Sequence, residues 1–295
     1  MPHQLPPYHL LFCRPLSYRL PTGRLPTALR RRNSPVAYRC PGASGRIPGV
    51  ETTELIAHLN EEGRLLAGAA AAAGPDAAVP TCPGWRIGDL LRHTGMVHRW
   101  ATAFVAERHT GYRPAAGDPD LDGAALLDWF REGHGLLVDA LSNAPDDLDC
   151  WTFLPAASPL AFWARRQTHE TAVHRADAES ALGEPGPVPQ RLAADGVDEL
   201  LCAFHGRRRS PVRTDAPKVL RVRTTDTGDV WTVRLSAEPP RAERSSEGPA
   251  DCELSGPAGR LHLVLWNRLP LTAVTLDGDA DIARLWREKS AITWA

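Results

Sequence analysis

The sequence predicts a helical bundle followed by a smaller α+β domain. Between residues 51 and 183, four segments of about 20 residues carry apolar side chains at helical spacing. A Pro/Gly-rich stretch over 184–190 then separates them from a region of short alternating segments and short helices. We therefore expect a bundle over 51–183, a linker over 184–190 and an α+β domain over 191–295.

Apolar spacing places the four bundle helices over 53–73, 86–108, 122–143 and 160–182. Pro80 and the Pro83-Gly84 pair break the first helix before the second begins. A longer connection over 111–121 leads to the third helix, and Pro159 precedes the fourth. This arrangement is typical of a four-helix bundle with one longer crossover.

Beyond the linker the apolar pattern changes. Helices are expected over 193–204, 259–267 and 279–288, and strands over 218–224, 230–236, 250–255 and 272–276. A turn at Asp226-Thr227-Gly228 separates the first two strands. Helices and strands mixed in this way predict a small α+β domain.

The first 50 residues differ in composition from the rest of the chain. They hold eight Arg and nine Pro but no Lys, Asp or Glu, which leaves 26 basic against 35 acidic residues and a net charge of −9 elsewhere. They contain no continuous apolar segment of the kind found in a signal peptide. We expect a disordered basic tail over 1–50, or a stretch translated from upstream of the native start.

The overall composition excludes several classes of protein. Apolar residues make up 43% and charged residues 23%, as in ordinary soluble proteins, and the net charge of −1 gives no reason to expect a nucleic-acid partner. No apolar run approaches the roughly 20 residues that a membrane helix needs. The six cysteines form no CxxC motif or secreted-type framework, so we expect free thiols in a cytoplasmic protein.

The predicted fourth helix contains the strongest candidate for chemistry. Glu170 and His174 lie about 40° apart around that helix, one turn above the other, and Asp177 follows close to the same line. Trp163 and Val173 flank this row, so it is expected to face the apolar interior. Because an uncompensated charge is costly there, a partner must satisfy these side chains.

A histidine of the second predicted helix supplies such a partner. His93 shares a face with Leu90 and Trp100 and is expected to point inward. Two histidines and one carboxylate from facing helices suit Zn²⁺ and leave a coordination position open, although Fe²⁺, Ni²⁺ or Mn²⁺ fit the same donors. The alternative is a hydrogen-bonded polar pair in the core without metal. His98 is expected to face outward. Arg165, Arg175 and Glu179 are expected to point away from the Glu170/His174 row.

Two separated segments resemble the mycothiol-dependent maleylpyruvate isomerase family. They are 81–93, which reads TCPGWRIGDLLRH, and 169–179, which reads HETAVHRADAE. The segments 254–268 and 276–279 are similar to the C-terminal α+β domain of that family. The resemblance covers about 51–295 and implies a DinB-like metal-binding four-helix bundle at the N-terminus.

The resemblance also implies roles for particular residues. It makes His93, Glu170 and His174 the zinc ligands, and it makes Arg268 a catalytic arginine that reaches the site from the second domain; the alternative for Arg268 is a surface residue ending a helix. Asp177 would orient His174 or contact the thiol cofactor mycothiol, or else form a buried salt bridge, for instance with Arg166.

The function implied is that of an isomerase that activates mycothiol on a bound metal for addition to a small electrophilic substrate. A mycothiol S-transferase acting on other electrophiles is one alternative. A non-catalytic, metal-stabilised binding or regulatory module is another, with Asp177 as a possible fourth ligand.

Overall fold

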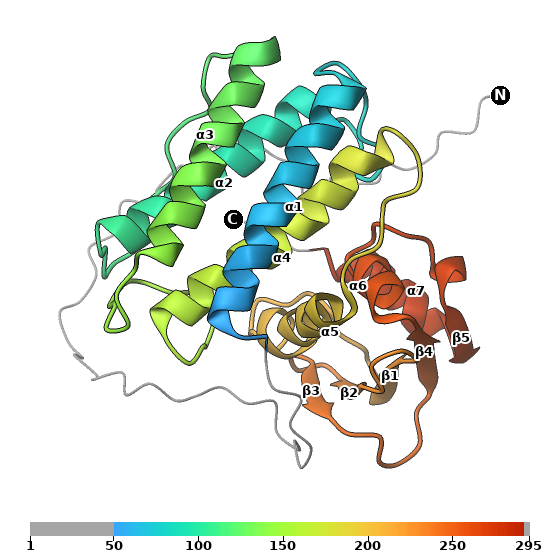
Figure 1. Ribbon diagram of the computed structural model, residues 1–295. Coiled ribbons are helices and arrows are strands. Elements are labelled where there is room, and N and C mark those ends of the chain that lie inside the picture. The colour runs from blue at the N-terminus through green and yellow to red at the C-terminus, as the bar shows by residue number, and fades with distance from the viewer. Residues whose placement is uncertain (1–49, 292–295) are drawn as a thin grey trace, which may run out of the picture.

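The computed structural model describes residues 50–291, and the predicted fold class is confirmed (Figure 1). The four bundle helices are α1 (Thr52–Ala73), α2 (Ile87–Ala106), α3 (Gly123–Ser142) and α4 (Pro159–Ser180). The tail predicted over 1–50 lies, apart from Val50, outside the described residues. Ser158 begins α4 because its hydroxyl accepts the backbone N–H of Ala161 at 3.1 Å, and Pro159 suits the first helical position.

Helix α4 is the centre of the molecule. In the bundle, α1 packs against α3 and α4, and α2 packs against the same two helices. The other side of α4 meets the C-terminal half, so every residue from Phe162 to Ala178 is buried except Arg165. Arg175, which was expected to point away from the Glu170/His174 row, is also buried: its side chain is 2% exposed and pairs with Glu62 of α1 at 2.7 Å. The helical-wheel argument assumed one covered face, whereas α4 is covered all round.

The C-terminal half begins with α5 (Gln190–Asp198), which continues as a π-helical turn over Glu199–Phe204. Five strands follow in one mixed sheet: β1 (Lys218–Thr224), β2 (Val230–Leu235), β3 (Arg241–Arg244), β4 (Cys252–Gly256) and β5 (Thr275–Gly278). Their order is β3-β2-β1-β4-β5, with β1 and β4 parallel and the other neighbours antiparallel. Helices α6 (Ala258–Leu265) and α7 (Ala280–Lys289) pack against β1 and β4.

Two strands differ from the sequence prediction. β3 was not predicted because its residues, Arg-Ala-Glu-Arg, lack apolar alternation; it lies at the edge of the sheet, where polar side chains are favourable. β5 begins three residues later than expected, because a 3₁₀ turn over Leu271–Ala273 follows Pro270.

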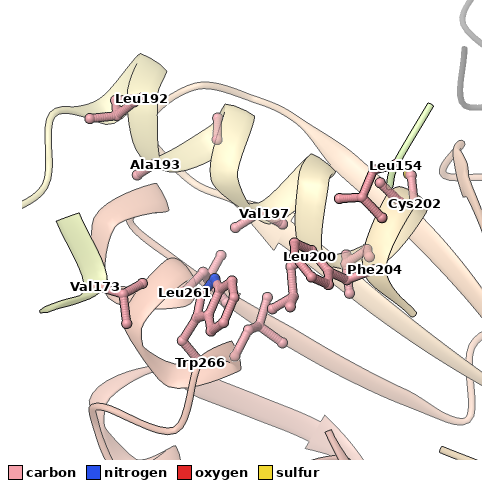
Figure 2. Packing of buried hydrophobic residues seen from close by; sticks show 14 of the residues in the cluster. Leu154, Val173, Leu192, Ala193, Val197, Leu200, Cys202, Phe204, Leu261 and Trp266 are labelled. Atoms are coloured by element: carbon pink, nitrogen blue, oxygen red, sulfur yellow. The ribbon is translucent and has the colours of Figure 1, made fainter. Parts of the chain in front are cut away.

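A shared apolar interface joins the bundle to the C-terminal half. Figure 2 shows Val173 of α4, Val197 of α5 and Leu261 of α6 converging there, and all three belong to one continuous buried cluster. The expectation of free thiols holds for Cys82, Cys150 and Cys252, which are also buried, and is wrong for Cys202, which is disulfide-bonded. Among residues 50–291, no helix combines the length and apolar character required to cross a membrane.

Candidate metal centre

Three donor side chains converge between α2 and α4. His93 comes from α2, and Glu170 and His174 come from successive turns of α4; their ligand atoms all lie within 4.8 Å of one another. The Oε1 atom of Glu170 is 3.2 Å from Nε2 of His174 and 3.7 Å from Nε2 of His93. The two imidazole rings meet edge to face with centroids 5.0 Å apart. A tetrahedral zinc ion with bonds of about 2.0–2.1 Å needs donors about 3.3 Å apart, which these separations approach.

The hydrogen bonding of the cluster also suits a cation. Nδ1 of His174 lies 2.9 Å from Oδ2 of Asp177, so this nitrogen carries a proton and donates it. Nε2 of His174 then faces the carboxylate of Glu170, and the buried Nε2 of His93 has no hydrogen-bond partner among residues 50–291. Two nitrogen lone pairs and a carboxylate oxygen therefore point at one place, which a divalent ion would satisfy.

Without a metal, a proton must take the cation's place. Burial alone would lower the pKa of His174, but its hydrogen bonds to Asp177 and Glu170 outweigh burial and raise that pKa to about 9. Burial would raise the pKa of Glu170, yet the neighbouring imidazoles of His174 and His93 hold it well below its usual range. Burial lowers the pKa of His93, so its imidazole is neutral and able to act as a ligand.

Asp177 links the cluster to the C-terminal half. Arg268, which follows α6, donates from Nε to Oδ1 and from Nη2 to Oδ2 of Asp177, both at 2.8 Å. The hydroxyl of Thr81 donates to Oδ1 at 2.6 Å. Of the partners considered for Asp177, the structure thus shows His174 and Arg268 and not Arg166. Arg268 is a buried residue, so it is not the surface arginine of the alternative prediction.

A second chain of charges braces Glu170. Nη2 of Arg166 donates to Oε2 of Glu170 at 3.1 Å, and Nη1 of Arg166 pairs closely with Glu199. Glu199 is buried and begins the π-helical turn after α5. Each metal ligand of α4 is therefore connected to a residue beyond the linker through one side chain. Arg166 connects Glu170 to Glu199, and Asp177 connects His174 to Arg268.

Sequence reasoning missed three participants in this arrangement. Thr81 and Glu199 lie on other elements, where no periodic pattern points to α4, while Arg166 was considered only as a partner of Asp177. Thr81 opens the first segment of family resemblance, which was the one available signal. The expectation that His98 faces outward is wrong: it is fully buried, with Nε2 2.9 Å from the hydroxyl of Thr171. Since α2 packs against both α3 and α4, its buried arc is wider than one face.

One side of the cluster reaches solvent. The His93 side chain is 17% exposed, against 7% for Glu170 and 0% for His174. The indole of Trp85 lies beside His93, with ring centroids 5.2 Å apart. An exogenous ligand would therefore approach past His93, and three protein donors leave a coordination position for it.

Comparison with known families gives two matches in chain order. Residues 53–179 match the mycothiol maleylpyruvate isomerase N-terminal domain, and residues 191–284 match the C-terminal domain of the same family. No curated protein matches the chain.

Two solved structures are similar to this chain. They are crystal structures of the mycothiol-dependent maleylpyruvate isomerase (TM-score 0.52) and of a histidine-to-alanine mutant of that enzyme (TM-score 0.55). Both are 14% identical to this chain, and the matches cover 77% of it and 93% of theirs. At that identity the likeness shows a shared fold. With both halves of the sequence matched in order, the chain belongs to the mycothiol maleylpyruvate isomerase family.

Proposed function

We propose that this protein is a metal-dependent isomerase of the maleylpyruvate isomerase type, using mycothiol as its thiol and zinc as its metal. The observation that carries the proposal is the convergence of His93, Glu170 and His174 on one buried point that opens to solvent past His93. When bound there, a divalent ion would stabilise a coordinated thiol as thiolate at neutral pH.

The residues around the ligands prepare them for this role. Asp177 holds the proton on Nδ1 of His174, which leaves Nε2 free to coordinate. Arg166 engages Oε2 of Glu170, which leaves Oε1 directed at the two imidazoles. Both effects fix the orientation of the donors before a ligand arrives.

The role expected for Arg268 needs a closer definition. Its guanidinium donates to Asp177 and to the backbone oxygen of Trp266, and Nη2 lies 3.7 Å from the sulfur of Cys82. Direct pairing with a substrate carboxylate would require the ion pair with Asp177 to open. We therefore assign Arg268 a positioning role that acts on His174 through Asp177, and we assign Asp177 to the same relay rather than to the thiol.

The chemistry proposed has the thiolate sulfur form a bond to one carbon of a cis double bond. The electron pair of the double bond would move onto a conjugated carbonyl oxygen. Rotation about the resulting single bond, return of that electron pair and expulsion of the thiolate would then restore the double bond in the trans form. A mycothiol S-transferase would share the first step and omit the elimination. The same centre supports both reactions, so substrate turnover must separate them.

Elemental analysis of the purified protein and of His174→Ala tests the metal. We expect about one equivalent of metal in the wild type and strong depletion in the variant; near-zero metal in both would refute the proposal. Turnover of maleylpyruvate with mycothiol by the metal-loaded protein tests the reaction. A metal closed entirely by protein ligands, with no exchangeable water, would instead support a non-catalytic module.

A further inference from the structure

A cavity of about 470 Å³ lies between the second half of α2, α3 and the connection that joins them. Its apolar walls come from Met96, Trp100 and Phe104 of α2 and from Trp129 of α3. This volume and lining are typical of sites for small organic molecules. The indoles and the phenyl ring favour a flat, unsaturated ligand over a compact polar one.

Three basic side chains line the cavity, and two of them are paired with acidic residues. Arg99 stacks over Trp129 at 3.9 Å and is paired with Glu132 at 2.8 Å, and His109 faces Glu107 at 2.9 Å. Arg113 also lines the cavity; it is an exposed residue, and it takes part in none of the ion pairs formed within residues 50–291. Its backbone oxygen accepts the indole N–H of Trp100 at 2.7 Å, which fixes this segment against the apolar wall.

The cavity adjoins the metal centre. Met96 is one helical turn beyond His93 on α2, and Trp100 follows one turn later on nearly the same face. On the other wall, Gly117 of the connection between α2 and α3 lines the cavity. The cavity therefore extends along α2 away from His93, the most exposed of the three candidate metal ligands.

We propose that this cavity binds a flat aromatic or conjugated carboxylate, with its apolar body between Trp100 and Trp129 and its carboxylate on Arg113. A carboxylate can pair with the accessible guanidinium of Arg113 at the rim of the cavity, and the ring can pack against the indoles. Naming this ligand as the electrophile rests on the proposed function, but its binding requires neither metal nor thiol.

Three probes separate the charge from the ring. trans-Cinnamate carries both, cinnamamide keeps the shape without the charge, and crotonate keeps the charge without the ring. Isothermal titration of the full chain should show cinnamate binding about tenfold more tightly than either control, because a charge-assisted hydrogen bond and the ring contacts each contribute. Equal binding of cinnamate and cinnamamide would overturn the assignment.

Matched variants locate the site. Arg113→Gln should weaken cinnamate binding about tenfold and leave cinnamamide unaffected, whereas Arg131→Gln, an exposed arginine paired with Asp128 on α3, should change neither. Ala103→Trp fills the cavity from α2 and should abolish binding, with circular dichroism confirming the fold. Unchanged cinnamate binding in both cavity variants would refute the proposal.

His174→Ala separates this inference from the proposed function. We expect the variant to lose metal and thiol-dependent turnover while binding cinnamate as the wild type does. Binding without turnover in the metal-loaded wild type would remove the isomerase assignment alone. Turnover of maleylpyruvate without cinnamate binding would remove the cavity assignment alone.

Discussion

Replacing Asp177 with asparagine should weaken the metal centre and the contact between the two halves of the chain together. The carboxylate is fully buried and accepts hydrogen bonds from Arg268, Thr81 and His174 at 2.6–2.9 Å. Asparagine keeps the shape but loses the negative charge, and its amide turns a donor toward groups that already donate. Removing one partner of a buried ion pair costs about 3–5 kcal/mol in unfolding free energy.

Asp177→Asn should reduce the free energy of metal binding by less than the free energy of unfolding. Loss of an outer partner of a histidine ligand reduces metal affinity about 10–100-fold, equivalent to roughly 1.4–2.7 kcal/mol. Chelator competition measures that affinity, and urea unfolding of metal-free and metal-loaded protein measures stability. Asp128→Asn is the control, because Asp128 is an exposed residue paired with Arg131 within one helix and should change stability by at most about 0.5 kcal/mol.

The reasoning fails under a specific result. If Asp177→Asn unfolds within about 1 kcal/mol of the wild type, the buried ion pair does not stabilise the fold as argued. If the variant also binds metal with unchanged affinity, Asp177 does not orient His174. Weakened metal binding with unchanged stability would limit the role of Asp177 to the ligand.

Three further predictions follow from the same geometry. Glu199→Gln should lower metal affinity severalfold and destabilise the fold by about 3 kcal/mol, since it leaves the buried Arg166 with Glu170 as its one acidic partner within residues 50–291. Chelator competition and urea unfolding measure the two effects, and unchanged values of both would show that the Arg166–Glu199 pair does not support the metal centre. A metal must displace the proton from His174, whose pKa is raised to about 9. The apparent metal affinity should therefore rise about tenfold per pH unit from pH 6.5 to 9 and then level off. A metal affinity that does not change with pH would contradict this. The same proton stabilises the metal-free protein fully below about pH 6.5, and that stability is lost as pH rises through 9. In α1, Gly63→Ala should destabilise the fold by about 1–3 kcal/mol, because its Cβ would lie within 2.5 Å of the His134 ring. Gly68→Ala meets nothing within 4 Å and should stabilise the fold by about 0.5–1 kcal/mol. Changes in melting temperature of the same sign for both variants would refute the packing argument.

Helical spacing was sufficient to predict that the three candidate ligands would lie close together. Glu170 and His174 are one turn apart, and that relation holds in any helix, so it needs no tertiary information. The inward direction of His93 followed from its apolar neighbours. Their convergence within 4.8 Å agrees with that reasoning.

The prediction failed where a second layer of packing decides the outcome. His98 was assigned an outward direction from a single buried face, but α2 packs mainly against two helices. The same argument did not foresee that Arg175 would be buried, because α4 is enclosed by both halves of the chain. The brace of Arg166 by Glu199 depends on a π-helical turn 33 residues away, whose position no local pattern indicates. Long-range pairing of charges is fixed by the assembled fold rather than by spacing.

The enclosure of α4 has a consequence for modularity. Although the chain matches two separate family domains, a fragment ending at the linker would leave the guanidinium of Arg166 without Glu199 and the carboxylate of Asp177 without Arg268, beside an uncovered Val173. Neither half should therefore be an autonomous folding unit. We expect the intact protein to melt in one cooperative transition, and a bundle expressed alone to aggregate. The two family domains therefore end at the linker, whereas the unit that folds cooperatively includes both of them.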